Sequence, residues 1–395
     1  MTADFELRTH AIALPSVQAD TRTSLCAMDA LPQELLDHII DELGSDADTL
    51  KCCSLTSNRL LAQSTARLFA PCHIYLSKWE PERLHTLQTS ARIRGSLTRL
   101  TLYALSFEHW SVVRDLPRLR ELTVSNYDPP AEDDVAAWLQ KPRSAERPID
   151  SLEVFGVPLH AAAWILRLFV SVKQLRLRYI EADRAVPIAS APHAVTHLDI
   201  KHVDTSTWRY LARTVSHAAL EGLTVDVSGP FIAGDGHESV LDDVVRAVGA
   251  RLRSYHHADL ASRRPAPHPP VLSACAQLSS VVLHTDAFWR GRSPDAWSRL
   301  FAFLASLPPS VLRLVLVLDS GHIDDNETLV AELAQVDWPE ICRALEPCSH
   351  LEILEVSAIS RVVGPTFMPL PDHSIAKNTI LGGLSERLKQ IIRFV

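Results

Sequence analysis

The stretch SVKQLRL at residues 171–177 is followed by the similar stretch AVTHLDI at residues 194–200. Both have the form apolar-x-x-apolar-x-apolar, which is typical of a short strand with one buried face. Further copies are SLTRLTL (96–102), RLRELTV (118–124), PIDSLEV (148–154) and ALEGLTV (219–225). The first apolar residues of the six copies are separated by steps of 22, 30, 23, 23 and 25 residues. A period of this size predicts a solenoid built from stacked repeats.

Helix-like segments lie between these copies, for example AAAWILRLF (161–169) and TWRYLARTV (207–215). One strand and one helix in each unit of about 20 to 29 residues is the pattern of a leucine-rich repeat, whose strands form one curved parallel sheet. We therefore expect an α/β fold in which residues 76–360 form a leucine-rich-repeat array. The array is irregular, because its later steps are longer and because few copies have the strand-ending asparagine seen at Asn126. A different α/β fold is the alternative.

The stretch LPQELLDHIIDELG at residues 31–44 predicts a helix outside the repeats. Pro32 fits a first helical turn, where the missing N–H costs nothing. The apolar residues that follow at helical spacing are Leu35, Leu36, Ile39, Ile40 and Leu43. Two more short helices are expected before Pro71, so residues 28–75 form a three-helix domain behind a flexible leader at residues 1–27. Because three short helices bury a small core, this domain is expected to lean on another domain or on a partner.

Residues 31–69 contain an ordered series of positions that match a known family. They are Leu31-Pro32, Glu34-Leu35-Leu36, Ile39-Ile40, Leu43, the run from Leu50 to Ser57, and Leu68-Phe69. On these residues the segment resembles an F-box, and the chain resembles an F-box protein with leucine-rich repeats, of the kind that fungi carry in large families. The resemblance implies that the three helices dock on a Skp-type adaptor, which ties the chain to a cullin scaffold and a ubiquitin-conjugating enzyme. The repeats would then hold the substrate.

The resemblance also implies which residues bind the adaptor. Carried over position by position, they are Leu31, Pro32, Leu35, Ile39, Ile40, Leu43, Leu50 and Leu55. One departure is Leu60, where many members have Trp after a basic residue. An exposed apolar stripe on a helix is unfavourable in water and is a common mark of a partner surface. The alternative is that Leu35, Ile39 and Leu43 only pack on the repeats.

The distribution of charge argues against nucleic acid and membranes as partners. The net charge is −8, and seven acidic residues stand between residues 29 and 50 without any Lys or Arg. The rest of the chain is therefore almost neutral. Such a chain has no overall basic field that would attract nucleic acid or an anionic membrane.

No motif indicates an enzyme, a metal site or a cofactor. The stretch GPFIAGDGHES (229–239) has glycines but lacks the Lys-Ser/Thr of a phosphate-binding loop. The seven cysteines include no CxxC pair, and the His and Cys residues do not repeat the pairings of a zinc site. Because the thiols are expected to be reduced and the N-terminus is unlike a signal peptide, we expect a cytoplasmic and/or nuclear protein. Because no catalytic motif is found, we expect that it catalyses no reaction itself.

Aligning the repeats predicts which residues project from the concave face of the sheet. The predicted substrate-binding residues there are Tyr103, Phe155, Arg176, Arg178 and Lys201. Since adjacent strands are about 4.8 Å apart, the three cations would form a basic site with an aromatic border, suited to an acidic or phosphorylated peptide. The alternative is that these cations pair with Glu153 and Asp199 on neighbouring strands.

The end of the array has apolar residues on both faces of its strands, because Val282, Val315 and Val317 stand at outward positions. Residues 361–395 are expected to be a tail with a capping helix, which has Leu384, Leu388, Ile391 and Ile392 at helical spacing. The same helix binding a partner is the alternative. Two functions agree with all these features: a substrate receptor of a cullin-type ubiquitin ligase, and a scaffold or regulatory protein that acts without ubiquitin transfer.

Overall fold

The structure is a computed structural model. It describes residues 31–43, 46–69, 73–77, 81–103, 113, 116–126, 147–182, 193–216, 218–226, 237–258, 272–285, 295–319, 330–331, 333–359 and 373–394. The leader expected at residues 1–27 lies outside these ranges. The chain divides into two compact units, Met1–Leu68 and Phe69–Val395.

The first unit consists of three short helices, α1 (Gln33–Glu42), α2 (Ala47–Thr56) and α3 (Asn58–Phe69). Helix α1 begins directly after Pro32, which is the N-cap residue and so stands one position before the first turn in which the sequence placed it. Helix α2 begins at a side-chain cap, because the carboxylate of Asp46 accepts hydrogen bonds from the backbone N–H groups of Asp48 and Thr49. The buried core consists of Leu36, Ile40, Leu50 and Leu60.

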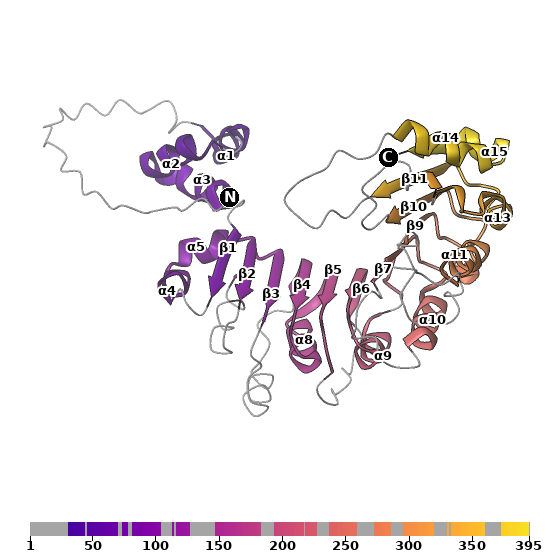
Figure 1. Cartoon of the computed structure of the whole chain (residues 1–395). Coiled ribbons are helices and arrows are strands. Elements are labelled where there is room, and N and C mark those ends of the chain that lie inside the picture. The colour runs from indigo at the N-terminus through magenta and orange to yellow at the C-terminus, as the bar shows by residue number, and fades with distance from the viewer. Residues whose placement is uncertain are drawn as a thin grey trace, which may run out of the picture. The chain divides into compact units, whose positions relative to one another are not determined.

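The second unit is built on one parallel sheet of 12 strands whose spatial order equals their order in the chain. The strands are β1 (His73–Ser77), β2 (Arg99–Tyr103), β3 (Glu121–Ser125), β4 (Arg147–Phe155), β5 (Phe169–Arg178), β6 (Ala194–Lys201), β7 (Gly222–Asp226), β8 (Ser254–Ala258), β9 (Ser280–Thr285), β10 (Arg313–Asp319), β11 (Ile353–Ile359) and β12 (Ile392–Phe394). They follow one another along an arc (Figure 1). This arrangement confirms the prediction of an α/β repeat solenoid with a curved parallel sheet.

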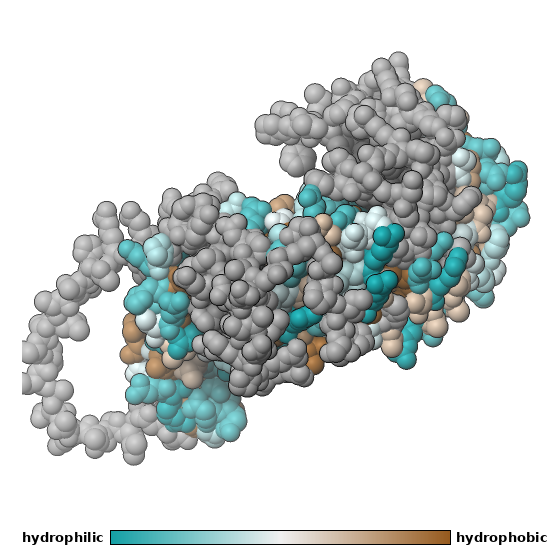
Figure 2. Space-filling model, turned by 90° about the horizontal axis from the view of Figure 1, so that it is seen from below, coloured by the Kyte–Doolittle hydropathy of each residue, from teal (hydrophilic) through white to brown (hydrophobic). Residues whose placement is uncertain are grey.

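Helices cover the outer side of the arc (Figure 1). They are α4 (Pro81–Thr89), α5 (Ala91–Ser96), α8 (Leu159–Leu166), α9 (Thr205–Thr214), α10 (His237–Val248), α11 (Asp295–Ala305) and α13 (Trp338–Ala344). Alternate strand residues such as Leu175 and Leu198 pack against buried helix residues such as Trp208 and Phe303 in one continuous core. The convex side mixes hydrophilic and hydrophobic residues among its visible described atoms (Figure 2).

A left-handed residue directly follows each of β3, β4, β5 and β6. These residues are Asn126 (φ 49°), Gly156 (φ 61°), Tyr179 (φ 54°) and His202 (φ 52°). The backbone N–H of each donates to the carbonyl of the last residue of the next strand, over 2.9 to 3.3 Å. The sheet ladder is therefore extended by one residue, and the turn that the sequence indicated only at Asn126 recurs with other residue types.

The C-terminal segment differs from the single capping helix that the sequence predicts. It consists of α14 (His373–Gly383), α15 (Glu386–Ile391) and then β12, which pairs in parallel with β11. Gly382 and Gly383 end α14, since glycine is a poor helix former. Leu384 and Leu388 are buried in the continuous core. The segment therefore closes the end of the array with helices and one further strand, and residues 361–372 lie outside the described ranges.

Two glycines test the left-handed turns. A Cβ atom at Gly156 would lie 2.8 Å from Oδ1 of Asn126 on a backbone with φ of +61°, whereas a Cβ atom at Gly95 in α5 would meet nothing within 4 Å. We expect Gly156→Ala to lower the free energy of unfolding by about 1–2 kcal/mol. Gly95→Ala should raise it by about 0.5–1 kcal/mol. Urea denaturation of the full chain measures both, and equal effects of the two variants would contradict the turn geometry.

Candidate protein-binding surfaces

Helix α1 exposes large apolar side chains to solvent. Leu35 is 50% exposed and Ile39, one turn further along, is 43% exposed. Pro32 precedes them and is also exposed. On α2, Leu55 is 84% exposed. Apolar side chains that stand side by side on one helix face are unfavourable in water and are typical of a surface that a partner covers.

The same helix has a second apolar face, which packs inside the unit. Leu36 and Ile40 are almost fully buried there, together with Leu50 of α2. Ile40 and Leu50, predicted as adaptor-binding residues, therefore serve the core in this structure, because the helices themselves cover them. Leu31 and Leu43 lie between these two classes: they are partly buried and pack against the same core.

Polar contacts attach α1 to α3. The carboxylate of Asp41 accepts a hydrogen bond from Nε of Arg67 over 2.6 Å and another from Nε2 of Gln63 over 2.7 Å. These two bonds, with that from Arg67 the larger influence, hold the pKa of the Asp41 carboxyl below its usual value. At the other end of α1, Arg59 donates to the carbonyl of Leu31. The exposed face with Leu35 therefore stands on a helix that is anchored at both ends.

The concave face of the sheet presents three rows of side chains, set by the register of β2 to β7. The rows are Arg99, Glu121, Ser151, Gln174, His197 and Gly222; Thr101, Thr123, Glu153, Arg176, Asp199 and Thr224; and Tyr103, Ser125, Phe155, Arg178, Lys201 and Asp226. This register is the one predicted from the sequence. It brings the three predicted cations and Phe155 together on β4 to β6, while Tyr103 lies two strands away.

The three cations have carboxylate partners on neighbouring strands. Arg176 lies 3.8 Å and Arg178 lies 3.4 Å from oxygens of Glu153. Arg178 is also 3.9 Å from Asp199, and Lys201 is 4.0 Å from Asp226. Three cations thus face three carboxylates, so the prediction of a basic site is wrong as to net charge. The alternative, cross-strand pairing with Glu153 and Asp199, is confirmed.

An aromatic group borders this charged cluster. The rings of Phe155 and Tyr179 meet edge to face with centroids 5.1 Å apart, and Tyr179 stacks on His202 at 4.6 Å. Phe155 was predicted for this surface, but Tyr179 and His202 were not. Both stand one residue after their strands, outside the alternating pattern on which the prediction rests. Tyr179 stands four residues after Leu175, and His202 stands four residues after Leu198. This equal spacing is the signal that could have identified them.

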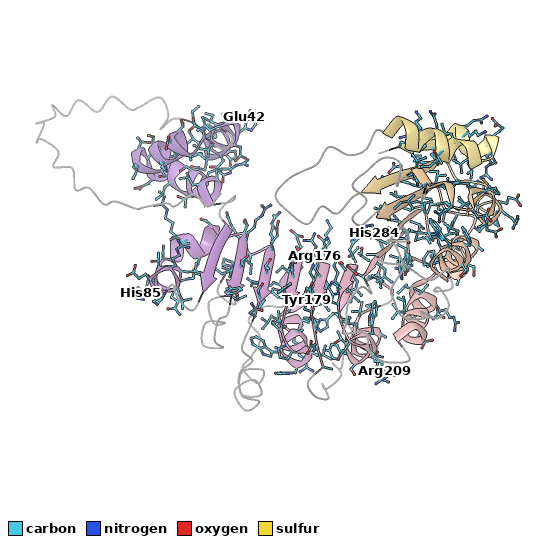
Figure 3. All side chains as sticks on the ribbon, viewed as in Figure 1. Glu42, His85, Arg176, Tyr179, Arg209 and His284 are labelled. Carbon is cyan, nitrogen blue, oxygen red and sulfur yellow. The ribbon has the colours of Figure 1, made fainter. Side chains whose placement is uncertain are left out.

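Beside the charged cluster, the concave positions of β8, of β9 and of the middle of β10 carry no Asp, Glu, Lys or Arg. A Cβ atom at Gly222 would lie 2.5 Å from Cδ2 of His197, so the glycine leaves room for that ring. Val282, Val315 and Val317 are only partly buried. His284 lies on the same face (Figure 3). The concave face therefore has a charged part at β4 to β7 and, beside it, a part at β8 to β10 that is mostly without charged side chains.

Two observations on the described side chains bear on metal binding and on nucleophilic thiols. No cluster of three or more His, Cys, Asp or Glu within the described ranges is arranged to hold a metal ion. The thiols of Cys275 and Cys348 are buried, and burial raises the pKa of Cys275 to about 11, which disfavours the nucleophilic thiolate. Among the helices in the described ranges, none has the length and apolar character needed to span a membrane.

Comparisons with known proteins add little. No protein-family model matches the sequence, and no curated protein matches it. Among solved structures, a chain from the "Crystal structure of Rad7 and Elc1 complex in yeast" is 13% identical, with a TM-score of 0.26, over 87% of this chain and 93% of that chain. A TM-score this low supports no conclusion about the chain.

The contacts of Asp41 predict its titration. We expect its carboxyl to titrate below the usual 3.8, and Arg67→Gln to raise the pKa toward that value. Because the folded pKa is depressed, the contribution of this carboxylate to stability is present above the unfolded-state pKa and is lost as the pH falls through the folded pKa. Side-chain carboxyl chemical shifts measured by NMR follow this titration. Arg246→Gln, which removes the partner of Asp242 in the repeat unit, is the control that should leave Asp41 unchanged.

Proposed function

We propose that this chain is the substrate receptor of a cullin-type ubiquitin ligase. In this proposal α1 docks on a Skp-type adaptor, which connects the chain to a cullin scaffold and a ubiquitin-conjugating enzyme. The concave face of the repeat unit captures a protein substrate, in the class of acidic or phosphorylated proteins. The chain itself catalyses no reaction and requires no cofactor, and it acts in the cytoplasm, the nucleus or both.

The observation that carries the proposal is the exposed apolar face of α1. Leu35 and Ile39 project from a helix whose opposite face already fills the core of its unit. Burying a fully exposed side chain of this size is worth about 1.5–3 kcal/mol. Because Leu35 is 50% and Ile39 is 43% exposed, covering the two together contributes roughly as much as one full burial. An amphipathic helix that lays apolar side chains into a groove of another protein is a recurrent mode of recognition.

The sequence resemblance suggests what the partner is. The ordered matches from Leu31-Pro32 to Leu68-Phe69 are those of an F-box, whose partner is a Skp-type adaptor. Leu60, the position that departs from the family pattern, is buried in the unit. Its side chain therefore contributes to packing, and the departure leaves the exposed residues Leu35, Ile39 and Leu55 in place.

In this arrangement the chain contributes proximity. A receptor that holds a substrate on one unit and an adaptor on another places a substrate lysine near the loaded ubiquitin-conjugating enzyme. Holding two reactants together raises their effective concentration, which accelerates transfer without any catalytic group on the receptor. The second candidate, a scaffold that acts without ubiquitin transfer, uses the same two surfaces but brings no transferase to the substrate.

The docking face predicts the behaviour of one double variant. We expect the parent chain to co-purify with a Skp-type adaptor and Leu35→Asp/Ile39→Asp to bind it at least about a hundredfold more weakly, because two desolvated apolar contacts are replaced by charges. Both side chains are exposed, so the variant should keep its helices. Co-expression followed by affinity capture and isothermal titration calorimetry measures the loss, and circular dichroism checks the fold.

The matched control changes two exposed apolar residues of the other unit. Val170 is 44% exposed and Leu312 is 40% exposed, and Val170→Asp/Leu312→Asp adds the same charge there without touching α1. It should bind the adaptor like the parent. Equal capture of all three chains would contradict docking through α1, and absence of capture of a folded parent would remove the adaptor from the proposal. Adding the cullin complex and the loaded conjugating enzyme then separates receptor from scaffold.

A further inference from the structure

We propose that the charged part of the concave face binds the anionic side chain, carboxylate or phosphate, of a peptide segment in a partner protein. Arg176, Arg178 and Lys201 hold the anionic group, and Phe155 and Tyr179 pack against its neighbouring residues. The proposal rests on the proposed function, since it names the class of substrate and the side chains that recognise it.

The first argument is the depth at which the charges lie. The side chain of Arg178 is 34% exposed, whereas those of its partners Glu153 and Asp199 are 22% and 18% exposed. Arg176 is likewise more exposed than Glu153, and Lys201 is more exposed than Asp226. The cations therefore form the outer layer and the carboxylates the inner one. A group that approaches from solvent meets positive charge first, although the cluster is neutral as a whole.

The second argument is that the ion pairs leave donors for a ligand. Their separations of 3.4 to 4.0 Å exceed the roughly 2.7–2.9 Å of a direct charge-assisted hydrogen bond. A guanidinium carries five N–H donors in a planar fork that matches a carboxylate or phosphate. Arg176 projects into the space in front of the concave face (Figure 3). A bound anion can accept direct hydrogen bonds there without breaking any shorter contact of these pairs.

The third argument is that the cations are held in position. Arg178 lies between Glu153 on β4 and Asp199 on β6, and Lys201 is its register neighbour. Like charges on adjacent strands repel each other. The carboxylates beneath Arg178 and Lys201 offset this repulsion and so allow the two cations to lie side by side. Cations ordered before binding lose less conformational entropy when a ligand arrives.

The fourth argument is the aromatic border. Phe155, the register neighbour of Arg178, and Tyr179 are exposed, and the Tyr179 ring contacts both Phe155 and His202. Tyr179 and His202 adopt left-handed backbone conformations, which cost roughly 1–2 kcal/mol each for residues other than glycine. Exposed rings in strained positions mark candidate recognition sites. They suit an apolar or aromatic residue next to the anionic one.

The same features favour a peptide over nucleic acid. A nucleic-acid backbone gains affinity by having many phosphates neutralised, which requires an extended field of uncompensated cations. Here three cations stand over three carboxylates on the four neighbouring strands β4 to β7, in a chain of net charge −8. Such a cluster accommodates one or two anionic groups, as a peptide side chain provides.

Fluorescence anisotropy with the full-length chain tests the proposal. The probes are fluorescein-labelled peptides Gly-Phe-X-Phe-Gly in which X is glutamate, phosphoserine, serine or lysine. We expect glutamate or phosphoserine to bind about tenfold or more tightly than serine, as one hydrogen-bonded charge contributes about 1.5–3 kcal/mol, and lysine to bind most weakly. Comparing glutamate with phosphoserine decides whether the partner is acidic or phosphorylated.

Variants assign the binding to the cluster. Arg178→Gln and Arg176→Gln should each weaken binding of the tighter probe about tenfold. Arg209→Gln is the matched control, since Arg209 is exposed on α9 on the outer side of the arc (Figure 3) and should have no effect. Thermal unfolding verifies that each variant is folded.

Three outcomes would overturn the proposal: equal binding of all four probes, absence of binding, or tighter binding of an oligothymidine single strand than of either anionic peptide. Loss of affinity in Arg209→Gln equal to that in Arg178→Gln would do so as well. The peptide assay uses the chain alone and the adaptor assay does not involve the concave face. A failure here with adaptor capture intact therefore overturns only the substrate class.

Discussion

In-register parallel pairing is the constraint on which the rest of the repeat unit depends. Strands β2 to β9 align residue by residue, apart from a register shift at Arg147/Pro148 between β4 and β5, so that Leu152, Leu175 and Leu198 lie side by side toward the helices. Because side chains alternate between the two faces of a strand, the same alignment places Arg176 and Asp199 next to each other on the concave face. Burial of the leucines thus determines which polar residues meet, and the charged cluster follows from the apolar core.

The first unit shows the opposite balance. Four side chains form its buried core, and polar contacts such as that between Asp41 and Arg67 contribute to its order. A unit of three short helices cannot bury every apolar residue that it contains. Leu35 and Ile39 therefore remain exposed to solvent. The exposed apolar surface is unfavourable for the isolated unit, and covering it provides binding free energy when a partner docks there.

The sequence alone was enough to predict strands β2 to β7 and their register, because buried apolar residues at a regular spacing determine how the strands pair, but β1, β8 and β12 were not predicted. It did not decide between a basic site and cross-strand pairs, since that depends on how Arg178 and Glu153 orient within an identical backbone. Nor did helical spacing separate Ile40, in the core, from Ile39, in solvent, because α1 is apolar on two faces. Tyr179 was missed because a turn residue contributes nothing to strand periodicity.

The left-handed turns that follow β3 to β6 can accept different residue types. The backbone at Asn126, Gly156, Tyr179 and His202 is nearly the same, and its hydrogen bond comes from the main chain, so residue identity is not prescribed there. Glycine adopts this conformation at the lowest steric cost, as at Gly156, but it has no side chain that could contact a ligand. Tyr179 and His202 therefore lower the stability of the backbone at these turns but provide aromatic rings at the ends of their strands. Replacing them with glycine to stabilise the turns would remove those rings.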